Sequence, residues 1–132
     1  MKYFKRLRQY KASNVKFDCT TQVSTSYDWW LVTRRVKGQM LFNWYSYSSS
    51  TRKHQHKLCS LLRELGIKID LEIQSPRGLQ DLEGAITYHQ GIINEMQTAI
   101  LNPRSRKETN KGRLEQILTN KKIIDKLKEL IA

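Results

Sequence analysis

Hydrophobic and polar residues alternate along much of the first half of the chain, a pattern typical of β-strands with one buried face. The alternation is strictest over 67–74, where Ile67, Ile69, Leu71 and Ile73 share one face. Together with the turn signals between these segments, the pattern predicts four strands, over 14–26, 27–36, 39–48 and 67–74.

The second and third of these strands are separated by Lys37-Gly38, which predicts a tight hairpin because glycine accepts a positive φ. Residues whose numbers sum to 75 then lie opposite one another. The face that we expect in the core carries Trp29, Leu31, Thr33, Arg35, Met40, Phe42, Trp44 and Ser46. The other face mixes aromatic, basic and amide side chains and is expected to be partly open to solvent; it carries Trp30, Val32, Arg34, Val36, Gln39, Leu41, Asn43, Tyr45 and Tyr47.

Apolar residues at helical spacing predict three helices. The first covers 51–65, with Ser49 or Ser50 as its N-cap and Gly66 as its stop. Its core side is expected to carry His54, Leu58, Leu61, Leu62 and Leu65. The other two helices run from Leu79 to a stop at Asn102-Pro103 and over 111–130, and their short connection predicts an antiparallel hairpin.

These elements predict an α+β fold, in which an antiparallel sheet of three or four strands carries one packed helix in the order β-β-β-α-β. A C-terminal antiparallel helical hairpin follows. We expect a basic α+β domain over 1–78 and the hairpin over 79–132. The hairpin is interpreted as a packing module that lies against the first domain or forms a homodimer interface.

The charge is distributed unevenly along the 132 residues. The net charge is +12, and residues 1–59 hold 12 of the 24 Lys and Arg residues but only two of the 12 acids, Asp18 and Asp28. A basic half of this kind is typical of proteins that contact a polyanion. The chain has two cysteines and no secretory signal pattern, which predicts reduced thiols in a cytoplasmic protein. It also has no apolar run of membrane-spanning length, so we expect no membrane contact.

Cations gather where the first helix begins, over residues 48–57. Helix N-termini carry partial positive charge, so a basic start is unfavourable unless an anion lies on it. Hydroxyl groups and cations at such a start can hold a phosphate or a carboxylate. The predicted anion site comprises Ser49, Ser50, Thr51, Arg52, Lys53, His56 and Lys57. The alternative is an ordinary capped helix whose cations are solvated or paired with carboxylates of the sheet.

Aromatic and basic side chains of the hairpin extend this candidate site: Trp30, Tyr45, Tyr47, Arg34, Arg35 and Lys37. Exposed aromatic rings can stack on unpaired bases while cations follow the phosphates. The sequence leaves open whether the three aromatic rings are exposed or are buried by the N-terminal arm or the C-terminal hairpin. The basic loop over 104–113 is either a solvated hairpin tip or a further phosphate contact.

Metal binding and catalysis find little support in the sequence. His54, His56 and Cys59 are close together, but His54 and His56 point in nearly opposite directions on a helix, and no spacing typical of zinc ligands occurs. We expect His54 and His89, which lie on apolar stripes, to be core histidines bonded to neighbours. Two carboxylates in the basic half are too few for a metal-dependent nuclease. The interpretation favours a binding protein without metal, cofactor or catalytic residues over an enzyme.

Several short motifs occur between residues 14 and 80: Tyr27-Asp-Trp-Trp30, Phe42-Asn43, Tyr45-Ser-Tyr-Ser48, Thr51, Lys53-His-Gln55, Leu65-Gly-Ile67 and Pro76-Arg-Gly-Leu-Gln80. Together they resemble small uncharacterised proteins encoded by bacteriophages. The resemblance implies a phage or mobile-element origin, and with it the cytoplasm of a host cell. It implies no activity and no site residues.

The leading hypothesis is a small basic protein that binds nucleic acid without catalysis. Single-stranded or structured substrates are favoured because no helix resembles a major-groove recognition helix; DNA and RNA are not distinguished. The alternative is a phage-encoded accessory or anti-defence protein that binds a host protein or a phosphate-bearing nucleotide at the same helix start.

Overall fold

The computed structural model describes residues 9–12, 15–18, 20–27, 29–46 and 48–132. The chain forms two compact units, Met1–Asp81 and Leu82–Ala132. The first unit extends three residues beyond the predicted boundary, because the segment after Gly78 is bonded into it. The backbone N–H of Leu79, for example, donates to the carbonyl oxygen of Leu31 at 3.0 Å.

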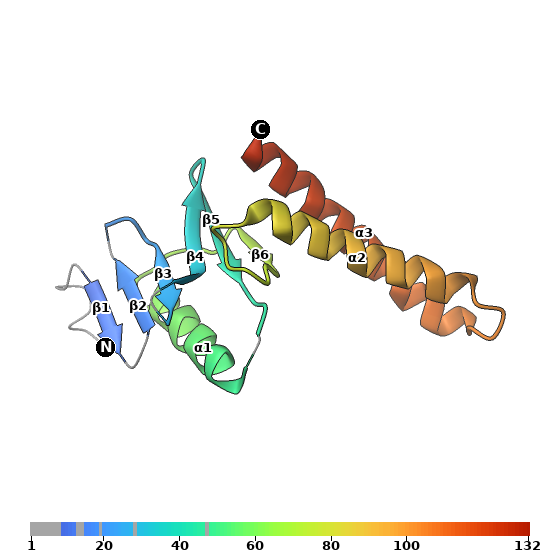
Figure 1. Cartoon of the computed structure of the whole chain (residues 1–132), viewed down its shortest axis with the longest axis horizontal. Helices are drawn as coiled ribbons and strands as arrows, with labels where there is room; N and C mark the ends of the chain where they lie inside the picture. Colours follow the sequence, from blue (N-terminus) through green and yellow to red (C-terminus); the bar gives the residue numbers. More distant parts are fainter. Residues whose placement is uncertain (1–8, 13–14, 19, 28, 47) are drawn as a thin grey trace. The chain divides into compact units, whose positions relative to one another are not determined.

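The protein has an α+β fold, as predicted, and its first unit contains a sheet (Figure 1). The described strands are β1 (Gln9–Ala12), β2 (Val15–Asp18), β3 (Ser24–Ser26), β4 (Trp30–Val36), β5 (Gln39–Asn43) and β6 (Leu71–Ile73). They lie in sequence order across the sheet, and each pairs antiparallel with the next except β5 and β6, which are parallel. The prediction of three or four antiparallel strands was therefore wrong in number and in the last pairing.

Both differences have local causes. The predicted strand over 14–26 is interrupted because the carboxylate of Asp18 accepts hydrogen bonds from the backbone N–H groups of Thr20 (2.8 Å) and Thr21 (3.2 Å), which form a turn between β2 and β3. The last pairing is parallel because helix α1 (Ser49–Glu64) connects β5 to β6, and a strand–helix–strand crossover returns the chain in the same direction.

The β4–β5 hairpin has the predicted register, with Thr33 opposite Phe42 and Val36 opposite Gln39. Lys37 and Gly38 both have positive φ, at 49° and 79°, as a type I′ turn requires. The hairpin and its turn are thus confirmed.

The assignment of hairpin faces was wrong at the start of β4. Ser24 and Ser26 of β3 are two residues apart and share one face of the sheet. Their partners in β4, Thr33 and Trp30, are three residues apart, so β4 contains one extra residue, as in a β-bulge. The extra residue breaks the alternation and turns Trp30 inward. Its side chain is 0% exposed, whereas Trp29, predicted for the core, is 59% exposed.

The second hairpin face is covered rather than open to solvent. The side chain of Asn43 donates to the carbonyl oxygen of Ser75 (2.9 Å) and accepts from the backbone N–H of Ser75 (2.9 Å). The guanidinium of Arg34 donates to the carbonyl oxygen of Leu79 at 2.9 Å. The segment that follows β6 therefore lies on this face, where Leu41 and Asn43 are fully buried.

Helix α1 begins after Ser48, whose hydroxyl accepts a hydrogen bond from the backbone N–H of Thr51 at 3.1 Å, and it stops before Gly66 at φ 73°. The observed N-cap lies one residue before the first of the two serines predicted for it. The core formed with the sheet comprises Val15, Phe17, Trp30, Val32, Phe42, Leu58, Leu61 and Leu62. Gln55 is buried as well, because its amide donates to the carbonyl oxygens of Asn43 (2.9 Å) and Tyr45 (2.7 Å).

The second unit is an antiparallel pair of helices, α2 (Leu82–Leu101) and α3 (Lys107–Ile131) (Figure 1). Ile93, Ile117 and Ile124 form its core. His89 is buried between the helices and its Nδ1 lies 2.6 Å from Oδ1 of Asn120, which confirms it as a core histidine. Leu114 and Leu118 of α3 are exposed. None of the described helices combines the length and apolarity needed to cross a bilayer.

Candidate nucleic-acid interface

The outward side of α1 is strongly basic. The inward side packs against the sheet. The exposed positions carry Arg52, Lys53, His56, Lys57 and Arg63, together with Ser49, Ser60 and one acid, Glu64. The first turn holds no acidic residue. Among the residues that the structure describes, no carboxylate lies within salt-bridge distance of Lys53 or Lys57. The alternative in which sheet carboxylates neutralise these two cations therefore finds no support in the described part of the chain.

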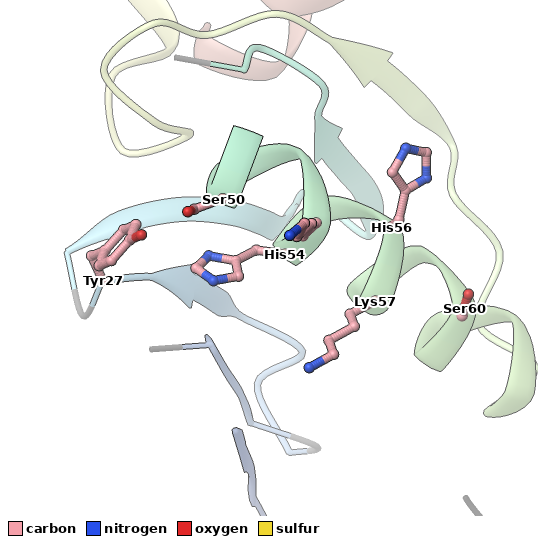
Figure 2. Close-up of a pocket in the computed structure, with 7 residues that line it drawn as sticks. Tyr27, Ser50, His54, His56, Lys57 and Ser60 are labelled. Carbon is pink, nitrogen blue, oxygen red and sulfur yellow. The ribbon is translucent and has the colours of Figure 1, made fainter. Parts of the chain in front are cut away.

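A surface pocket of about 600 Å³ lies along this side of the helix (Figure 2). Ser50, Lys53, Lys57 and Ser60 line it from successive turns, since their spacing of three to four residues places them on one side of the helix. Tyr27, His54 and His56 complete the lining. The pocket thus combines two amines, two serine hydroxyls, two imidazoles and the phenol ring of Tyr27.

Tyr27 reaches the pocket from the turn between β3 and β4. Its ring centroid lies 5.2 Å from that of His54, and the side chain remains 37% exposed. The backbone of Tyr27 has φ 56°, a left-handed conformation that is unfavourable for a residue with a bulky side chain. The turn therefore holds this ring beside the helix at a conformational cost.

His54 is fixed from beneath by the sheet. Its Nδ1 lies 2.6 Å from the hydroxyl of buried Ser26, which leaves Nε2 as the nitrogen available to a ligand. Burial, with a smaller contribution from the positive charge of Lys57, lowers the pKa of His54. The expected core histidine is confirmed, and it also forms part of the pocket wall.

We expect the fold to lose stability as the pH falls below about 6.5, the ordinary histidine value. The pKa of His54 is lowered by burial, and burial also lowers the pKa of His89 against the opposing effect of Asn120. The unfolded chain then binds protons that the folded chain does not, so the stability contribution is complete above about pH 6.5 and declines below it. Melting temperatures measured between pH 7.5 and 5.5 test this. A His54→Gln, His89→Gln variant should show a weaker dependence, and an unchanged slope would contradict the assignment.

The helix start is less available to an anion than predicted. Thr51 is fully buried, its backbone N–H is taken by the hydroxyl of Ser48, and the two hydroxyls lie 2.9 Å apart. Ser50 lines the pocket, whereas Ser49 is exposed outside it. Lys53 and Lys57 therefore become the centre of the site, about one turn further along α1.

The two helix histidines point in different directions, as the sequence predicts. His56 points away from His54 and Tyr27 in Figure 2, and its ring lies 5.7 Å from that of Trp44. His56 thus borders the pocket without joining the cluster at Lys53 and Lys57. Among the described residues, no group of three or more His, Cys, Asp or Glu side chains is arranged to hold a metal ion.

The hairpin cations do not converge on this site. Arg34 is bonded to the carbonyl oxygen of Leu79, and Arg35 donates to the side chain of Gln22 and to the carbonyl oxygen of Gly38, both at 2.8 Å. Lys37 is exposed at the hairpin turn and is not among the pocket residues. These three residues are engaged by the fold or lie outside the pocket lining.

Of the three aromatic residues predicted for the site, the two that the structure describes do not line the pocket. Trp30 is fully buried and its indole N–H donates to the carbonyl oxygen of Pro76 at 3.0 Å; Tyr45 is half-buried against the core. Tyr47 lies outside the described residues. Among the residues whose burial the structure describes, the large aromatic side chains that are exposed are those of Tyr27 and Trp29, which flank the start of β4. The irregularity in β4 buries Trp30 and exposes Trp29, and regular alternation of the sequence does not reveal this exchange.

Comparison of the chain with protein-family models, with curated proteins and with solved structures yields no match.

Proposed function

We propose that this protein binds single-stranded or structured nucleic acid through the basic side of α1, without catalysing a reaction on it. The observation that carries the proposal is the placement of Lys53 and Lys57, one turn apart and both exposed, on the lining of one pocket. Like charges at this spacing destabilise a helix. A phosphate group between them would remove that repulsion and accept hydrogen bonds from both amines.

The length of the basic side favours a polymer over a single anion. Arg52 and Arg63 are separated by eleven residues of α1, which corresponds to about 16 Å along the helix axis. Successive phosphates of one strand in a duplex are separated by about 3.4 Å along its axis, so this side can contact several nucleotides. Exposed Tyr27 and Trp29 supply aromatic surface beside it.

One observation favours a second candidate function. The volume of about 600 Å³ lies within the range of roughly 300–1,000 Å³ that is typical of small-molecule sites. A phosphate-bearing nucleotide could therefore be the ligand, as in the alternative of a phage-encoded accessory protein, and an acidic host protein could use the same cations. The phage origin, the cytoplasmic location and dimerisation through the helical hairpin remain parts of the proposal.

Binding of labelled single-stranded oligonucleotides at about 50 and 200 mM salt tests the proposal. A protein that neutralises several phosphates loses affinity steeply with salt, and for a single strand the slope of log affinity against log salt is about −0.7 for each phosphate contacted. The proposal predicts measurable binding at low salt and a steep decrease. Absence of binding at low salt would overturn it, and a shallow dependence with tight mononucleotide binding would support the second candidate.

A further inference from the structure

We infer that the α1 pocket receives one unpaired base, which stacks on the ring of Tyr27 while the adjoining phosphates contact Lys53 and Lys57. This inference rests on the proposed function and specifies its ligand. It concerns the pocket formed by Tyr27, Ser50, Lys53, His54, Lys57 and Ser60 (Figure 2).

Tyr27 has a backbone conformation that is energetically unfavourable for its residue type. Non-glycine residues with positive φ are uncommon, and bulky ones are the least tolerated. Asn or Gly would adopt φ 56° more readily, yet the chain has a tyrosine here whose side chain is 37% exposed. Such strained positions concentrate at functional sites. A ring that is held at a cost and left open is suited to a ligand with a flat face.

The chemical groups around the Tyr27 ring also suit a nucleotide. On one side, Tyr27 contacts the imidazole of His54, whose Nδ1 is occupied by Ser26. Nε2 of His54 is therefore positioned to exchange a hydrogen bond with a base edge. The amines of Lys53 and Lys57 are on the same pocket lining, where they can contact phosphates. Aromatic, hydrogen-bonding and cationic groups within one pocket match the face of a base, its polar edge and the adjoining phosphates.

The exposed ring of Tyr27 also favours unpaired over paired nucleic acid. Bases within a duplex are stacked on their neighbours and show no face to a protein ring. Stacking on Tyr27 is thus open only to a base in a single strand, a loop or a flipped position. The pocket should therefore distinguish unpaired from paired nucleic acid, whereas phosphate contacts alone would not.

The test uses single-stranded oligonucleotides that carry one 2-aminopurine, a fluorescent base whose emission is quenched when it stacks. Wild-type protein and a Tyr27→Phe variant should quench the emission. A Tyr27→Asn variant should not, and its affinity for single strands should fall about 10-fold, since stacking of one base contributes a factor of this order. Duplex affinity should change little.

Tyr27→Asn also controls for folding. Asparagine tolerates the left-handed conformation, so the variant should melt at an unchanged or higher temperature while it loses base contact. Weaker single-strand binding with retained stability supports the inference. Unaltered quenching in Tyr27→Asn, or quenching that disappears only in Trp29→Ala, would overturn it. In both of those cases salt-dependent binding would persist and the proposed function would stand. If the wild-type protein binds no oligonucleotide at low salt, the proposed function itself is refuted.

Discussion

Reversing the charge of Lys53 and Lys57 together should lower the affinity for single-stranded nucleic acid about 100-fold at low salt. Each lysine is expected to contact one phosphate, and loss of one such contact reduces affinity by about tenfold, which is equivalent to about 1.4 kcal/mol. The slope of log affinity against log salt should also decrease by about 1.4, because two fewer phosphates are neutralised and each contributes about 0.7 for a single strand. Both side chains are exposed, so the fold should remain intact.

A matched variant separates the site from the overall charge. Lys68→Glu with Lys122→Glu makes the same change in net charge at two exposed positions outside α1, one in each unit. Its affinity should fall by less than about threefold, because neither lysine lines the pocket and a charge without a direct phosphate contact acts only through long-range attraction that salt screens. Equal losses in the two double variants would show that binding depends on net charge alone, and α1 would no longer be the site.

Trp30→Ala should destabilise the first unit by about 3–5 kcal/mol, the range typical of truncating a large buried aromatic side chain. Trp30 is fully buried in the core between the sheet and α1, and its indole N–H donates to the carbonyl oxygen of Pro76. Truncation leaves a cavity and an acceptor without this donor. Since small domains have unfolding free energies of about 5–15 kcal/mol, the loss should be visible as a large decrease in denaturant midpoint.

The neighbouring tryptophan provides the control. Trp29→Ala removes the same side chain one residue earlier, where it is 59% exposed, and should change the unfolding free energy by less than about 1 kcal/mol. Regular alternation along 27–36 predicts the opposite ranking, with Trp29 in the core. The pair therefore tests the irregularity in β4 directly, and a larger loss from Trp29→Ala would contradict the described register.

The sequence predicted the fold where local signals decide it. Lys37-Gly38 specifies its hairpin, Gly66 ends α1, and the spacing of apolar residues locates the two C-terminal helices. The predictions were wrong where the outcome depends on pairing between distant segments. One extra residue in β4 reverses the faces at Trp29 and Trp30, and the segment after β6 covers a hairpin face that looks amphipathic in isolation.

Only part of the candidate site could be predicted from the sequence, again because local signals are visible there and contacts between distant segments are not. The cations of α1 follow from helical periodicity, and Lys53 and Lys57 indeed share a pocket. The sequence did not indicate the place of Tyr27 in the pocket, because it depends on a backbone angle and on the approach of the β3–β4 turn to His54. Cations can be assigned to an exposed side from sequence alone, but their aromatic neighbours require the three-dimensional structure.

Chemical-shift mapping of the 15.6 kDa protein with a short single-stranded oligonucleotide would test the central claim most directly. We predict that the largest amide shifts occur at Tyr27 and along α1 around Lys53 and Lys57, with little change over 102–106, the loop between α2 and α3. Shifts confined to that loop, or spread evenly over all exposed lysines and arginines, would contradict binding at the basic side of α1.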